Sequence, residues 1–157
     1  MKKVILAAVL LGIFTVSAFA LRGEDAPAAV KAKFASLYPK VSKVKWDKED
    51  ANWEAGFESN DVEMSCLFDA AGNLLETESE VAVSSLPKAV IDYCAKNYAG
   101  KKIIEGAKIV DAKNVTTYEA EIKGVGDLIF DSQGGFVKNA GIEKDAEDED
   151  DEKDEKK

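Results

Sequence analysis

The sequence contains no histidine and only two cysteines, Cys66 and Cys94. Without histidine it cannot build a Ser-His-Asp or Cys-His catalytic centre, because the imidazole carries the proton in both. Two cysteines alone cannot supply the thiolate ligands of a structural zinc site, and the commonest zinc ligand is missing. We therefore expect a protein that is not an enzyme and that has no catalytic residue and no obligatory cofactor.

The scarcity of cysteine leaves two interpretations open. In an oxidising compartment Cys66 and Cys94 could form one disulfide. Alternatively they are two buried thiols, since both stand at positions where the surrounding pattern calls for an apolar side chain.

Long apolar runs are missing except at the N-terminus, where residues 4–16 follow Lys2 and Lys3. The run is shorter than the roughly 20 residues of a membrane-spanning helix. It is followed by Ala18-Phe19-Ala20, a small-x-small cleavage site. Residues 1–20 are therefore predicted to be a secretory signal peptide. We expect a periplasmic bacterial protein, with secretion as the alternative, and no membrane insertion after the leader is removed.

Acidic residues outnumber basic ones by 30 to 21, and the imbalance is greatest at the C-terminus. Residues 143–157 hold ten acids and four lysines, a composition that predicts a disordered acidic tail. An acidic protein is repelled by phosphate backbones and anionic lipids, which argues against nucleic acid and membrane surfaces as partners. A basic partner or a cation is allowed.

The chain between these two ends contains an internal repeat. Three segments of the first copy have counterparts in the second: residues 25–30 and 85–90, 53–55 and 118–120, and 67–72 and 129–134. The sequence therefore predicts two repeats, residues 21–83 and residues 84–142.

Each repeat opens with a helical pattern and continues with alternating strands. Val30, Phe34 and Tyr38 recur at helical spacing, and Asp25 and Ser85 are predicted N-caps. The period then changes to two, which is typical of half-buried antiparallel strands. We predict an α+β fold of two tandem units, each a helix followed by a four-stranded antiparallel sheet with one face on the helix and the other face open to solvent.

These segments resemble the PepSY-like, beta-lactamase-inhibitor-like family of exported bacterial proteins. The resemblance rests on Leu37-Tyr38-Pro39, on Val44-Lys45-Trp46, on residues 53–57, and on the hairpin 68–76 with its second copy, 130–137. It implies that the two sheets join side by side, with the helices on one face and an open sheet on the other, and that the open face binds another protein.

The open face of the first repeat is predicted to carry the contact surface. Trp46 and Trp53 would be hot-spot candidates on a binding face. Trp53 shares a strand face with Ala55 and Phe57, however, which favours core packing. The remaining face is polar with a small aliphatic patch, and its candidate residues are Lys45, Glu54, Glu58, Glu63, Leu67 and Leu75, with Asp47, Ser65 and Thr77 beside them. We expect a non-catalytic binding or inhibitor-like module whose partner is an envelope protein of unknown identity.

A calcium-responsive envelope protein is the alternative function. The turn at residues 69–73 has a faint likeness to a calcium loop, and the acidic tail offers further carboxylates. Asp and Gly serve hairpin turns for purely local reasons, which favours the turn interpretation of this segment.

Overall fold

The computed structural model describes residues 25–141. The predicted signal peptide and acidic tail lie outside these residues. The elements in chain order are α1 (Ala28–Leu37), β1 (Lys45–Glu49), β2 (Asn52–Ser59), β3 (Val62–Asp69), β4 (Leu74–Glu80), a 3-10 turn η1 (Val83–Ser85), α2 (Lys88–Asn97), β5 (Ile103–Asp111), β6 (Thr116–Ile122), β7 (Gly126–Asp131) and β8 (Phe136–Gly141).

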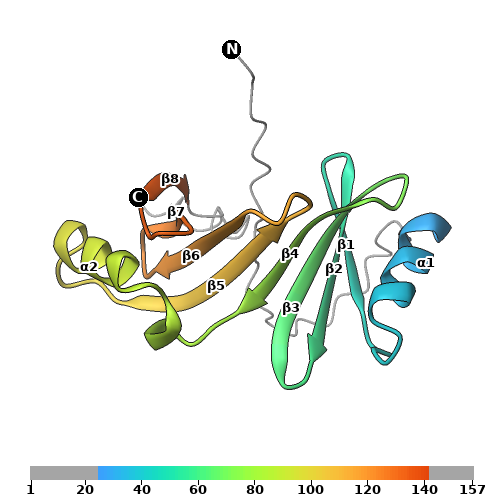
Figure 1. The fold of residues 1–157 in the computed structure, drawn as a ribbon, viewed down its shortest axis with the longest axis horizontal. Coiled ribbons are helices and arrows are strands. Elements are labelled where there is room, and N and C mark those ends of the chain that lie inside the picture. Colours follow the sequence, from blue (N-terminus) through green and yellow to red (C-terminus); the bar gives the residue numbers. More distant parts are fainter. Residues whose placement is uncertain (1–24, 142–157) are drawn as a thin grey trace, which may run out of the picture.

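All eight strands belong to one antiparallel sheet in the order β1 to β8 (Figure 1). The predicted α+β class is confirmed, and the strands form a single continuous sheet. The junction between the repeats is a ladder of five cross-strand pairs between β4 and β5, from Glu76 with Asp111 to Glu80 with Ala107. Because both strands satisfy their backbone groups in this ladder, the sheet has edges only at β1 and β8.

Both helices pack on the same face of the sheet, although they lie at opposite ends of the molecule (Figure 1). Met64 of the first core pairs with Ser79, which pairs with Lys108. Lys108 pairs with Tyr118, and Tyr118 pairs with Phe130 of the second core. Directly paired residues share a face of an antiparallel sheet, so this row connects the two cores across one side of the sheet.

Each helix covers its own apolar cluster. Val30 and Phe34 of α1 pack on Trp53, Phe57 and Phe68. The rings of Phe34 and Phe57 meet edge to face, with 4.9 Å between the ring centroids. The core interpretation of Trp53 is confirmed, since 6% of the residue is exposed. The second cluster joins α2 to β6 and β7 and includes Val90, Cys94, Ile122, Leu128 and Phe130.

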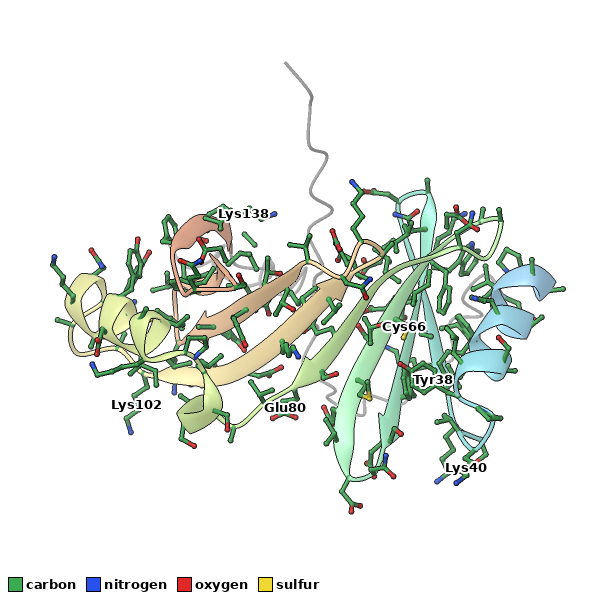
Figure 2. All side chains as sticks on the ribbon, in the orientation of Figure 1. Tyr38, Lys40, Cys66, Glu80, Lys102 and Lys138 are labelled. Carbon is green, nitrogen blue, oxygen red and sulfur yellow. The ribbon has the colours of Figure 1, made fainter. Side chains whose placement is uncertain are left out.

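The two cysteines are free and buried, and they belong to different clusters. Figure 2 shows Cys66 and Tyr38 between the sheet and α1, with the Cys66 Sγ 3.7 Å from the Tyr38 hydroxyl oxygen. Burial raises the pKa of both thiols. The interpretation as buried thiols is therefore confirmed in place of a disulfide.

The predicted N-caps are wrong. The helices begin directly after Pro27 and Pro87, and neither helix start has a side-chain capping hydrogen bond. Asp25 instead forms an ion pair with Lys31. Proline fixes φ at a helical value and has no N–H to satisfy, so it starts these helices without a polar cap.

A glycine in each C-terminal hairpin allows the turn to touch the helix of its own repeat. Gly72 has φ +88°, and a Cβ on it would lie 2.9 Å from the carbonyl oxygen of Ala29. Gly134 has φ +84°, and its Cβ would lie 2.7 Å from the Cβ of Ala89. Both positions need glycine for the left-handed backbone and for this close approach.

The Gly72→Ala variant tests this contact against Gly100→Ala. Gly100 also has a positive φ, +81°, but a Cβ there would meet no atom within 4 Å. Both variants lose stability because alanine disfavours the left-handed backbone, while only Gly72→Ala also places a Cβ against α1. We expect Gly72→Ala to lose about 1–3 kcal/mol more free energy of unfolding than Gly100→Ala, measured by urea denaturation. Equal losses would contradict the packing of the turn against the helix.

Candidate functional site

The face of the sheet opposite the helices is lined with carboxylates. Each of the six consecutive strands β2 to β7 places at least one acid on it, namely Glu54, Glu63, Glu78, Glu105, Glu119 and Asp127. We call this surface the acidic face. The lysines that the strand register places on it, Lys45 and Lys138, stand on the two edge strands β1 and β8.

Glu78 occupies the middle of the acidic face. It pairs with Ser65 of β3 on one side and with Ile109 of β5 on the other. Only 2% of the residue is exposed, and neither carboxyl oxygen has a hydrogen-bond partner. Both oxygens of a carboxylate are strong acceptors, so an unpartnered buried carboxyl costs free energy until a donor reaches it.

Glu119 and Glu54 continue this arrangement on both sides of Glu78. Glu119 is 4% exposed and pairs with Ala107 and Ile129, and its Oε2 has no partner. Glu54 is 8% exposed and pairs with Leu67, and its Oε1 has no partner. The acidic face therefore alternates buried carboxyl groups with buried aliphatic side chains.

Burial is the largest cause of raised pKa values among these glutamates. It raises the pKa of Glu78 to about 9, with the carboxylate of Glu119 as the next cause. Burial and then the carboxylate of Asp127 raise the pKa of Glu119 to about 8. Burial and then the carboxylate of Glu121 raise the pKa of Glu105 to about 7. At neutral pH, Glu78 and Glu119 consequently hold protons in the free protein.

The predicted contact residues occupy different parts of this surface. Glu58 and Glu63 are exposed and directly paired, while Glu54 and Leu67 are directly paired and buried. Lys45 is exposed on β1, where its Nζ lies 3.0 Å from an Asp47 carboxylate oxygen. Of these five candidates on the open face, three are therefore exposed and two are buried.

A β-bulge changes the expected position of two residues of β4. Phe68 pairs with Leu74, but the preceding residue, Leu67, pairs with Glu76. The extra residue is Leu75, which is half-buried, and it reverses the alternation of the strand after it. Thr77 therefore lies on the helix side, where its Oγ1 is 3.6 Å from the Cys66 Sγ, and its predicted place on the open face was wrong.

The same bulge explains why simple alternation along the sequence does not place the central carboxylates on the open face. Glu76 and Glu78 face the open side only because the strand is displaced by one residue. Glu105, Glu119 and Asp127 belong to the second repeat, where no contact surface was predicted. The alternating acids Glu76-Thr77-Glu78-Ser79-Glu80 were the available signal, because a strand with a glutamate at every second position has one acidic face.

The turn that resembled a calcium loop uses its carboxylate internally. Asp69 Oδ1 accepts hydrogen bonds from the backbone N–H groups of Ala71 at 2.9 Å and Asn73 at 2.8 Å. Its Oδ2 accepts one from the Asn73 side-chain amide at 2.7 Å. These bonds, above all the side-chain bond from Asn73, lower the pKa of Asp69. Within residues 25–141, no three cysteine or acidic side chains are grouped so that they could hold a metal ion.

A family model described as "Putative beta-lactamase-inhibitor-like, PepSY-like" matches residues 16–76 and again residues 63–138. The chain belongs to this family. The two matches agree with the predicted tandem repeat. A search of curated proteins finds no match.

Solved structures share the PepSY-like fold of this chain. A protein of Bacteroides eggerthii DSM 20697, titled among "putative periplasmic proteins", superposes with a TM-score of 0.67 at 14% identity, covering 75% of this chain and 90% of its own. A DUF2874 family protein of Bacteroides uniformis ATCC 8492 superposes with a TM-score of 0.66 at 20% identity, covering 74% of this chain and 89% of its own. A BLIP-like protein of Bacteroides fragilis NCTC 9343 superposes with a TM-score of 0.60 at 24% identity, covering 74% of this chain and 86% of its own.

No helix within residues 25–141 is both long enough and apolar enough to cross a bilayer.

The raised pKa values predict that stability falls as the pH rises. The folded protein holds protons on Glu78 and Glu119 that the unfolded chain has already released above about pH 4.5. The contribution of these two groups to stability is therefore greatest below about pH 4.5 and declines between about pH 5 and 9. Glu78→Gln removes one of these groups and is expected to gain about 1–3 kcal/mol at pH 8, measured by urea denaturation across this pH range.

Glu58→Gln is the matched control, because it makes the same change on the same face at an exposed position. It is expected to leave the pH profile unchanged. A wild-type profile that is flat or that rises toward pH 9 would show that the buried carboxyls do not titrate as described.

Proposed function

We propose that this PepSY-like protein is a non-catalytic module of the bacterial periplasm that binds a protein partner through the acidic face. The observation that carries the proposal is the group of buried carboxyl oxygens on Glu54, Glu78 and Glu119 that have no partner in the free chain. A buried acceptor without a donor is costly, and docking of a partner that brings donors would remove that cost.

The layout of the fold supports the same surface. The helices α1 and α2 and their clusters occupy the other side of the sheet. On the acidic face, the buried side chains of Leu67, Ile109 and Ile129 alternate with the carboxyl groups. Protein interfaces combine buried apolar area with a polar, solvent-accessible rim, and the buried aliphatic side chains of this face supply such apolar area. Glu58, Glu63 and Lys45 would form part of that rim, and Leu75 borders it at the bulge.

The proposal also includes a leader for export and the limits of the two repeats. The proposal takes residues 1–20 as a leader that is removed during export, and residues 143–157 as an acidic C-terminal segment; both lie outside the described residues. Residues 21–83 and 84–142 each contribute one helix and four strands, so the binding surface spans both repeats. The calcium-responsive alternative remains a prediction for the tail, and no contact among residues 25–141 favours it.

Site-specific photocrosslinking in the producing cell tests the proposed surface. A photoreactive phenylalanine derivative is placed at Glu63 or Lys45 on the rim, and at Lys33 of α1 or Lys96 of α2 as controls. All four positions are exposed. We expect discrete crosslinked species from the two rim positions and none from the helix positions, read by immunoblotting and identified by mass spectrometry. Adducts from the helix positions alone, or from none of the four, would contradict the proposal.

A further inference from the structure

We propose that the acidic face recognises an arginine-bearing basic segment of its partner, and that the carboxyl groups of Glu78 and Glu119 are the anchor for the guanidinium. This inference rests on the proposed function and adds the chemistry of the partner to it. The first observation that supports it is the distribution of charge on the sheet. Six adjoining strands contribute acids to the face, whereas its strand lysines are confined to β1 and β8.

The lysines at the edges do not neutralise the centre. Lys45 ion-pairs with Asp47 on its own strand. Lys138 lowers the pKa of Glu119, but this is the weakest of the influences on that carboxyl, and burial and three neighbouring acids outweigh it. The charges that act on Glu78 are all carboxylates, those of Glu119, Glu54, Glu105 and Asp127. A cation entering between Glu78 and Glu119 would therefore be attracted by the neighbouring carboxylates, and only the weaker effect of Lys138 on Glu119 would oppose it.

Hydrogen bonding decides which kind of cation fits. Both oxygens of Glu78 and the Oε2 of Glu119 lack donors. A guanidinium carries five N–H donors in a rigid plane and can bond two carboxylates at once. An ammonium is a more strongly hydrated point charge that matches this pair less well. A divalent metal ion is a poorer candidate, because no three acids within residues 25–141 converge on one point.

The aliphatic residues next to the anchor suit the stem of an arginine. Ile109 pairs directly with Glu78, and Ile129 pairs directly with Glu119. Both isoleucines are buried on the acidic face. Arginine packs its methylene groups along apolar surface while its head makes polar contacts, so each anchor carboxyl has a matching apolar neighbour.

The chain's own C-terminal segment is not the expected occupant. Residues 143–157 contain ten acids and four lysines, so the segment has the same sign of charge as the face. Charge complementarity therefore excludes this acidic segment and indicates a basic occupant.

The test uses the exported protein, purified from the periplasm of a producing strain, and three synthetic peptides of alternating glycine and a second residue. The second residue is arginine, lysine or citrulline, the last being an uncharged analogue of arginine. Binding is followed by chemical-shift changes of backbone amides in NMR spectra at pH 7.5. We expect the arginine peptide to shift the amides of β4 to β7, the lysine peptide to bind more weakly, and the citrulline peptide to give no shift.

A pair of double variants provides the matched comparison. Glu78→Gln with Glu119→Gln is expected to weaken the arginine peptide about tenfold or more, because two charge-assisted hydrogen bonds are lost. Glu58→Gln with Glu63→Gln makes the same two substitutions at exposed positions on the same face and is expected to weaken binding less than about threefold. Circular dichroism and denaturation verify that both variants are folded.

Several results would overturn the inference. Equal binding of the lysine and arginine peptides, or an equal loss in both double variants, would show unspecific attraction to negative charge. Shifts of the same amides by calcium chloride and not by the arginine peptide would assign the face to a metal ion. If rim crosslinks persist in the Glu78→Gln, Glu119→Gln variant, the arginine anchor is wrong while the proposed protein-binding function stands; if they are absent from the wild-type protein, the proposed function fails as well.

Discussion

The ladder between β4 and β5 is the interaction on which the arrangement of this molecule depends. Its five pairs, from Glu76 with Asp111 to Glu80 with Ala107, join strands that belong to different repeats. The side chains of a strand alternate between faces, so a slip of one residue would exchange the two faces of one repeat relative to the other. With the observed register, both helices lie on one side, and Glu78 and Glu119 lie on the other.

This register creates a surface that a stable fold does not need. The helix side of the sheet follows the usual logic of folding, since Phe34, Phe68 and Phe130 bury apolar area against it. The opposite side buries carboxyl oxygens that have no donor, and well-packed apolar residues would be more stable there. Native proteins tolerate such costly groups where function requires them, which is why the acidic face, and not the helix side, carries the functional proposal.

The sequence predicted the parts of the fold that follow from local periodicity. Val30 and Phe34 share a helix face because their spacing demands it, and Trp53 is buried because it alternates with polar residues along a strand. The bulge at Leu75 could not be predicted, because the extra residue depends on how β4 pairs with β3. For this reason Thr77 was assigned to the wrong face and Glu78 was overlooked.

The site was harder to predict than the fold, because it depends on contacts between distant segments. Glu54 and Leu67 alternate visibly within one repeat, so they could be placed on the open face from the sequence. The neighbourhood of Glu78 and Glu119 arises only when β4 pairs with β5 and β5 pairs with β6. The helix starts show the same limit on a smaller scale, since Asp25 has the chemistry of an N-cap but pairs with Lys31.

The most direct test is an NMR titration of the glutamate side-chain carboxyl carbons of this protein. We expect Glu78 and Glu119 to titrate with pKa values of about 9 and about 8. The two signals are identified by their absence from the spectra of Glu78→Gln and Glu119→Gln. Titration of every glutamate near its ordinary value of about 4.3 would show that the acidic face is solvated in the free protein. The unpartnered carboxyls would then no longer mark a binding site.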